Sequence, residues 1–173
     1  MCLLLMAVIL AAGAVDLDRE GRDPAYVESI VKRSQKIVDK LKLKDAEMAQ
    51  HVTHIIANRY FKLNDIYEVR DAKVKQAKET LTGDAKQAAV KAAEDEKDAA
   101  LYRCHFEFPA ALSLYLDDKQ IDAVKDGMTY GVLMVTYNSH VDMIPTLTQE
   151  EKAQIMAWLV EAREFAMDAE NSK

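Results

Sequence analysis

Apolar residues recur every three or four positions along most of this chain, which is the spacing of amphipathic helices. Asp23 followed by Pro24 is a typical helix start, and the apolar positions from Val27 to Leu41 predict a first helix behind it. A second helix is expected to begin near Asp45, with its apolar side marked by residues 48–67.

The apolar pattern weakens between Val69 and Ala100, where Ala, Lys, Glu, Asp and Gln dominate. This composition supports a helix but buries little surface. Thr82-Gly83 predicts the end of the second helix, and Asp84 the cap of a third. The sequence therefore predicts a long, solvated, antiparallel arm formed by these two helices.

Apolar positions at helical spacing return from Leu101 to Tyr115, and Pro109 should break that helix before Phe108. A fourth helix is expected from Asp117 or Asp118 to near Gly127. The last helix should run from Thr148 to about Ala169. Its inward side is predicted to carry Ile155, Trp158, Leu159, Ala162 and Phe165.

The segment 129–137, TYGVLMVTY, allows two interpretations. Its β-branched and aromatic residues favour a short strand, but a lone strand leaves its backbone hydrogen bonds unpaired. A buried helix is the alternative. The chain as a whole is predicted to be all-α, a single helical domain over residues 15–173 built as a bundle of about five helices with a long helical arm.

The first 14 residues form an apolar run that ends in Ala12-Gly13-Ala14 and is followed by charged residues. This pattern is typical of a signal peptide and predicts a periplasmic or secreted protein, not inserted in a membrane after cleavage. Cleavage would leave Cys104 as the one cysteine and exclude an intrachain disulfide.

The net charge of −6 argues against nucleic acid and against anionic lipid as partners, because both are bound by basic surfaces. No Gly-rich phosphate loop or nucleophile elbow occurs, and nothing in the sequence specifies a cofactor or an oligomeric state. Glu47, His51 and His54 lie on one helical face and could present three ligands to a metal. A fourth ligand is not evident, and a surface or partly buried histidine pair is the simpler interpretation.

Two helix starts share a Leu followed by a capping box, at Leu116–Gln120 and Leu147–Glu151. These boxes resemble the Leu-Thr-x-x-Gln motifs of Spy-like periplasmic chaperones, which hold unfolded clients on a concave helical surface. The present chain lacks the strongly basic surface of those proteins.

A broader resemblance covers the second half densely and the first half loosely. Its pieces are FP-x-x-LS-x-YL from Phe108, KDGMTY from Lys125, VTYN from Val135, MIP-x-LT from Met143 and EARE-x-AMD from Glu161. They resemble a family of uncharacterised exported proteins of Gram-negative bacteria (Bacteroidetes-type), ascribed a sugar-binding role and encoded among polysaccharide-utilisation genes. Its members continue past this point with a basic tail, so the resemblance implies truncation at the C-terminus.

Sugar sites combine aromatic faces with amide, imidazole and carboxylate groups. The residues of these types that we single out are Tyr102, His105, Tyr130, Tyr137, Asn138, His140 and Asp142. Tyr102 and His105 could instead be core residues. If they form a site, the helix around His105 and the polar loop around His140 should meet in one concave patch.

The resemblance and these residues predict a non-catalytic exported protein that binds carbohydrate. A Spy-like chaperone or a structural interaction protein is the alternative. An enzyme acting on polysaccharides is the third hypothesis, although 29 acidic residues do not single out a catalytic pair.

Overall fold

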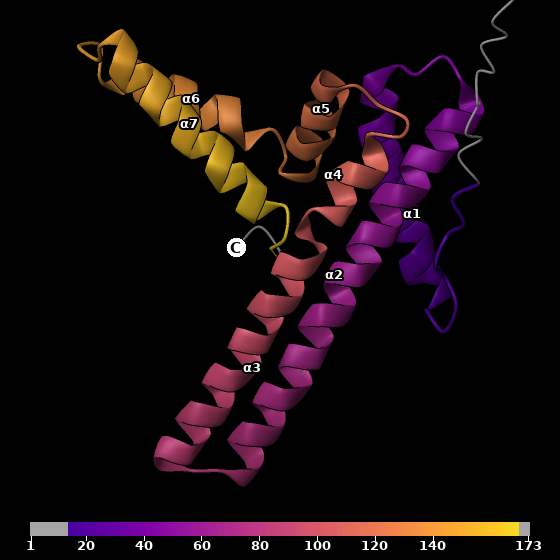
Figure 1. Cartoon of the computed structure of the whole chain (residues 1–173), viewed down its shortest axis with the longest axis vertical. Coiled ribbons are helices and arrows are strands. Elements are labelled where there is room, and N and C mark those ends of the chain that lie inside the picture. The colour runs from indigo at the N-terminus through magenta and orange to yellow at the C-terminus, as the bar shows by residue number, and fades with distance from the viewer. Residues whose placement is uncertain (1–13, 170–173) are drawn as a thin grey trace, which may run out of the picture.

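A computed structural model describes residues 14–169, and within this range the secondary structure is entirely helical (Figure 1). It contains the helices α1 (Pro24–Leu41), α2 (Ala46–Thr80), α3 (Gly83–His105), α4 (Glu107–Leu112), α5 (Asp118–Met128), α6 (Val132–Met143) and α7 (Gln149–Ala166). The predicted all-α class is confirmed. The strand considered for residues 129–137 is not present, because a turn at 129–131 leads directly into α6.

The helix starts follow the local chemistry of the sequence. The side chain of Asp23 accepts from the Tyr26 backbone N–H, and Asp45 caps α2 in the same way. Reciprocal capping boxes open α5 at Asp117 and α7 at Thr148, as predicted. Each cap satisfies N–H groups that have no partner within the helix.

The predicted break near Pro109 is confirmed. α3 ends at His105, and Phe106 joins it to α4 with helical dihedral angles, so the two segments form one bent helix. Pro109 has no N–H to donate to the His105 carbonyl oxygen, which interrupts the hydrogen-bond ladder at this point.

The core lies where α1, the first half of α2, α4 and α5 meet. Val52, Ile56, Leu112 and Val124 are fully buried there. A smaller cluster of Ile30, Ala57 and Phe61 joins α1 to α2. α1 and α5 approach closely at Gly127, where an added Cβ would lie 2.7 Å from Ile37 Cγ2.

α2 and α3 continue beyond this core as an antiparallel arm (Figure 1). Between Leu63 and Leu101, the described residues that are buried are two alanines, Ala77 and Ala93. Arg70 pairs with Glu94, and Lys73 with Glu96, across the two helices. The prediction of a solvated helical arm is confirmed. Gly83 begins α3 with a positive φ of 56° and does not end α2, which stops at Thr80.

α6 and α7 pack on each other and project from the body as a hairpin (Figure 1). The helix alternative for residues 129–137 is confirmed from Val132 onward, but the expected burial is wrong, because no residue of α6 is buried. Trp158 and Phe165 of α7, predicted to face inward, are 60% and 72% exposed. α7 meets the body instead through buried Arg163, which pairs with Asp122 and Asp126 of α5.

The predicted signal peptide falls almost wholly on residues 1–13, outside the described residues. No described helix is both long enough and apolar enough to cross a membrane.

Candidate ligand-binding site

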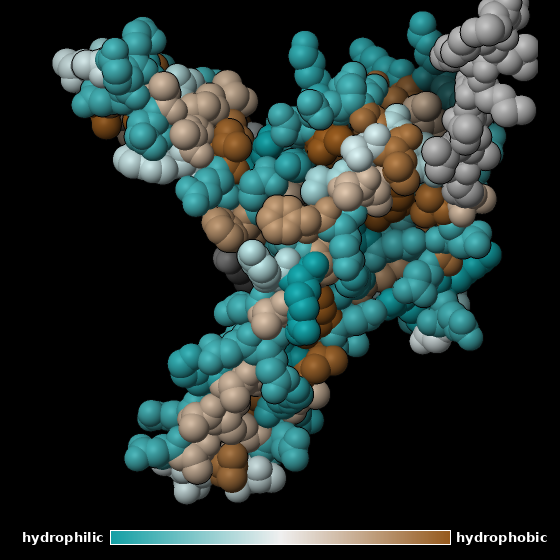
Figure 2. Space-filling view, viewed as in Figure 1, coloured by the Kyte–Doolittle hydropathy of each residue, from teal (hydrophilic) through white to brown (hydrophobic). Residues whose placement is uncertain are grey.

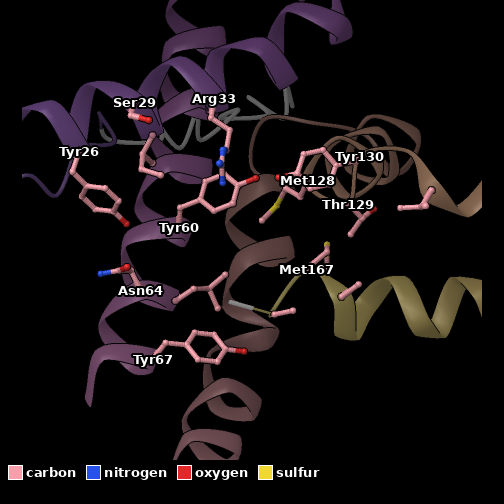
Figure 3. A pocket seen from close by; sticks show the side chains of 15 residues that line it. Tyr26, Ser29, Arg33, Tyr60, Asn64, Tyr67, Met128, Thr129, Tyr130 and Met167 are labelled. Carbon is pink, nitrogen blue, oxygen red and sulfur yellow. The ribbon is translucent and has the colours of Figure 1, made fainter. Parts of the chain in front are cut away.

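An open cavity of about 560 Å³ lies between α1, α2, the α5–α6 turn and the residues that follow α7. Its walls contain four tyrosines, which we call the tyrosine groove: Tyr26, Tyr60, Tyr67 and Tyr130. Figure 3 shows these side chains around the opening together with Ser29, Arg33 and Asn64. The cavity has the size and the aromatic and polar lining of a small-molecule site.

Helical spacing places these residues side by side. Tyr26, Ser29 and Arg33 lie on one face of α1, and Tyr60, Asn64 and Tyr67 lie on one face of α2. Because α1 packs on α2, the two faces form adjoining walls of the groove.

The partly buried Tyr60 forms the floor of the groove. It packs against both apolar clusters, and burial raises the pKa of its phenol to about 12. The Arg33 guanidinium carbon lies 5.5 Å from the centre of its ring, in reach of a cation–π interaction. Burial also raises the pKa of the Tyr26 phenol, so both hydroxyls remain hydrogen-bond donors at neutral pH.

Tyr67 fixes the lower wall. Its hydroxyl donates to the Asp168 carbonyl oxygen at 2.8 Å, and the Arg70 guanidinium carbon lies 5.2 Å from the centre of its ring. The segment that follows α7 is thereby attached to α2.

Tyr130 occupies the turn between α5 and α6, and its side chain is 70% exposed at the rim of the groove. Its φ of 58° lies in the left-handed region, which costs a residue with a Cβ roughly 1 to 2 kcal/mol. The neighbouring Gly131 shares this conformation and donates its N–H to the Asp126 carbonyl oxygen at 2.7 Å. Such strain persists where the surrounding structure enforces it and is concentrated at functional sites.

A polar cluster, which we call the buried polar cluster after its buried centre of Arg59 and Asp168, adjoins the groove, since Asp168 lies between the lining residues Met167 and Ala169. Asp168 pairs with Arg59 of α2, and its second oxygen lies 2.7 Å from His105 Nδ1. Arg59 also donates to the Cys104 carbonyl oxygen at 3.0 Å. Glu164 accepts from Lys125 at 2.8 Å, and the His105 ring nitrogen Nε2 lies 4.0 Å from it. These contacts connect α2, α3, α5 and α7 and hold the groove walls in place.

Of the residues predicted as a binding site, Tyr130 is the one that lines the tyrosine groove. Tyr102 is exposed on α3, where it packs edge-to-face on Phe106 at 6.2 Å, and so it is not a core residue. His105 belongs to the buried polar cluster.

The remaining predicted residues lie on α6: Tyr137, Asn138, His140 and Asp142. The prediction of a polar loop there is wrong, because this segment is helical and the His140 ring lies 2.8 Å from the Thr136 carbonyl oxygen one turn back. α6 ends at the far tip of the hairpin, whereas α3 ends at the body (Figure 1). The expectation that His105 and His140 meet in one patch is therefore wrong.

The three candidate metal ligands make separate contacts. His51 stacks edge-on against Tyr115 at 5.3 Å, His54 Nδ1 lies 2.6 Å from the Val15 carbonyl oxygen, and Glu47 is exposed. Over residues 14–169, no group of three His, Cys, Asp or Glu side chains is arranged to hold a metal ion.

Most of the groove was not anticipated from the sequence. Tyr60 and Tyr67 stand at i and i+7 beside the apolar stripe of α2, and Tyr26 and Arg33 repeat this spacing in α1. Two aromatic and polar stripes on consecutive helices are a signal that could have identified the two walls. The juxtaposition of Tyr130 with them depends on the packing of α5 and is not a local property.

The fold and the groove define an all-helical protein with an open, tyrosine-lined cavity. The chain belongs to the family described as protein of unknown function (DUF3826), which it matches over residues 27–173. None of the curated proteins matches it.

Proposed function

We propose that the protein binds carbohydrate in the tyrosine groove and acts as a non-catalytic exported component of polysaccharide use. The observation that carries this proposal is the convergence of Tyr26, Tyr60, Tyr67 and Tyr130 on one cavity with hydroxyl and amide groups. Pyranose rings pack their C–H faces on aromatic rings, and their hydroxyls pair with such polar groups. The exposed ring of Tyr130 at the rim offers the stacking surface.

The lining favours binding over hydrolysis. Glycosidases place two carboxylates on either side of the bond that they cleave. Here carboxylates lie in an adjoining cavity of about 530 Å³, which shares Tyr26 and Asn64 with the groove. One of them, Asp65, is engaged by Arg22 at 2.7 Å, which leaves it poorly placed as a catalytic acid.

Calorimetric titration of the purified chain with a panel of plant and bacterial oligosaccharides tests the proposal. Tyr130→Ala should weaken binding about tenfold, because it removes the stacking surface. Tyr102→Ala is the matched control, since Tyr102 is equally exposed but lies outside the groove. Equal losses in both variants, or no binding of any saccharide by the unmodified chain, would contradict the proposal.

A second candidate function, binding of unfolded protein chains, is favoured by the hairpin of α6 and α7. Exposed apolar surface marks interaction sites, and Figure 2 shows such surface in brown among polar side chains on the hairpin. The large apolar residues exposed there are Val132, Met134, Val135, Met143, Ile144, Trp158, Val160 and Phe165. Flexible methionine side chains suit clients of varied shape.

A client-aggregation assay separates the two functions. If the hairpin holds unfolded chains, the protein should delay aggregation of a reduced client, and Trp158→Ser should reduce that effect while Tyr130→Ala leaves it unchanged. If instead Tyr130→Ala weakens saccharide binding and Trp158→Ser leaves it unchanged, the function is assigned to the groove.

A further inference from the structure

Arg33 distinguishes the tyrosine groove from a site for neutral sugars. It is the one charged side chain among the described residues that line the cavity. It extends from α1 over the Tyr60 ring, as Figure 3 shows. A cation held above an aromatic ring at a cavity mouth is positioned to meet an incoming anion.

The guanidinium of Arg33 forms no ion pair with any described residue, although the chain carries a net charge of −6. Three arginines with little exposed side chain are neutralised: Arg22 pairs with Asp65, Arg59 with Asp168 and Arg163 with Asp126. Arg33 shares its lack of an ion pair with the exposed Arg19 and Arg103, but of these three it alone lines the groove. Within residues 14–169, the hydrogen-bond donors of Arg33 are therefore not used in an ion pair and can meet a bound anion. A guanidinium binds a carboxylate through two parallel hydrogen bonds.

A second cavity of about 550 Å³ adjoins the groove and shares Ser29, Arg33 and Tyr130 with it. Lys36 lines this second cavity, one turn beyond Arg33 on α1, and it too has no ion pair with a described residue. The two cavities adjoin at Arg33 and Tyr130, and we call the pair of them the cleft. Its second part is lined by Lys32, Arg33 and Lys36 against one carboxylate, Glu28, which pairs with Lys32.

We infer that the ligand of this cleft is an acidic saccharide, with a uronate carboxylate bound by Arg33 and the adjacent sugar ring stacked on Tyr130. This inference rests on the proposed carbohydrate-binding function and specifies its ligand class. Lys36 lines the adjoining cavity and is placed to meet a second acidic residue of the same saccharide. A sulfate ester carries the same negative charge as a uronate carboxylate. The experiment therefore compares carboxylate and sulfate as the group that Arg33 binds.

The experiment titrates the full chain with three oligosaccharides: one built of uronates, its fully methyl-esterified form, and a neutral oligosaccharide, with a sulfated oligosaccharide as a fourth arm. Arg33→Gln should weaken binding of the uronate chain about tenfold, as expected for loss of a charge-assisted bidentate contact, and leave the neutral chain unchanged. Higher salt should weaken binding of the acidic oligosaccharide and leave binding of the neutral oligosaccharide unchanged. Arg19→Gln is the control, because Arg19 is exposed and lies outside both cavities.

Each outcome decides the inference. Tighter binding of the acidic than of the esterified chain, lost in Arg33→Gln, supports it, and the relative affinity of the sulfated arm shows whether carboxylate or sulfate is preferred. If Arg33→Gln binds every saccharide as the unmodified chain does while Tyr130→Ala does not, the inference is overturned and the proposed function stands. If no saccharide binds, both are overturned.

Discussion

The Nδ1 atom of His105 lies 2.7 Å from the Oδ2 atom of Asp168, which joins the end of α3 to the segment that follows α7. The same carboxylate pairs with Arg59 of α2, and Met167 beside it is buried in the main core. The base of the α6–α7 hairpin is therefore fixed by a buried ionic contact as well as by apolar packing.

Asp168→Ala should lower the free energy of unfolding by roughly 3 kcal/mol, because it leaves the buried guanidinium of Arg59 without its partner. Urea unfolding followed by circular dichroism measures the change. Asp142→Ala is the control, since Asp142 is exposed on α6, and it should alter stability by less than about 0.5 kcal/mol. Equal stability of the two variants would show that the buried pair contributes nothing.

Gly127→Ala should destabilise the domain by about 1 to 3 kcal/mol, because its Cβ would lie 2.7 Å from Ile37 Cγ2 and would separate α5 from α1. Ile37→Ala removes the obstructing atoms at the cost of a cavity. The double variant should therefore lose less stability than the sum of the two single variants, as a double-mutant cycle would measure. Strict additivity would mean that the two residues do not interact.

Helix boundaries were predictable where short-range chemistry determines them. The caps at Asp117 and Thr148 and the break at Pro109 depend on residues within one turn, and all three were predicted correctly. The sequence leaves the secondary structure of the segment after Tyr130 open between strand and helix, because its apolar and β-branched residues suit both. In the structure this segment is helical and packs on α7, a contact that is not local in sequence.

Tyr130 is the one residue of the tyrosine groove that the sequence predicted as part of a site. The other walls come from α1 and α2, so their convergence depends on tertiary packing. The polar run Asn138 to Asp142 has the composition of a loop, yet it is helical at the end of α6. His105 has the residue type of a binding side chain, but its ring contacts Asp168 at a partly buried position outside the groove.

Tyr130→Gly should keep or raise the free energy of unfolding, by up to about 1 kcal/mol, because glycine adopts the φ of 58° without steric cost. Tyr130→Val should lower it, since a β-branched residue tolerates this conformation less well than tyrosine does. Thermal unfolding of the three proteins provides the comparison. Indistinguishable midpoints would contradict strain at this turn.

Alkaline conditions should destabilise the protein through Tyr60. Its pKa is raised from 10.0 to about 12 by burial, so the folded state favours the neutral phenol. The stabilisation is complete below pH 10 and is lost as the pH rises from 10 to about 12, by roughly 2 kcal/mol. Tyr60→Phe should lose less stability over this range in urea titrations at successive pH values. An identical pH dependence in both proteins would argue against the shift.

Removing residues 74–80 and 86–92, seven from each side of the arm, should leave a single cooperative unfolding transition. Seven residues are close to two helical turns, so the remaining contacts keep their register. The removed segments contribute one buried residue, Ala77, to the described structure. A broadened transition in chemical denaturation would show that the arm is part of the cooperative core.

The tyrosine groove has a floor that packs on the core and an exposed rim. Tyr60 and Met128 serve the core as well as the cavity, whereas Ser29, Arg33 and Tyr130 are solvent-exposed and contribute little to packing. Selection can therefore exchange the rim residues one at a time without loss of folding. Chains that differ only at the rim would present different binding surfaces above the same floor.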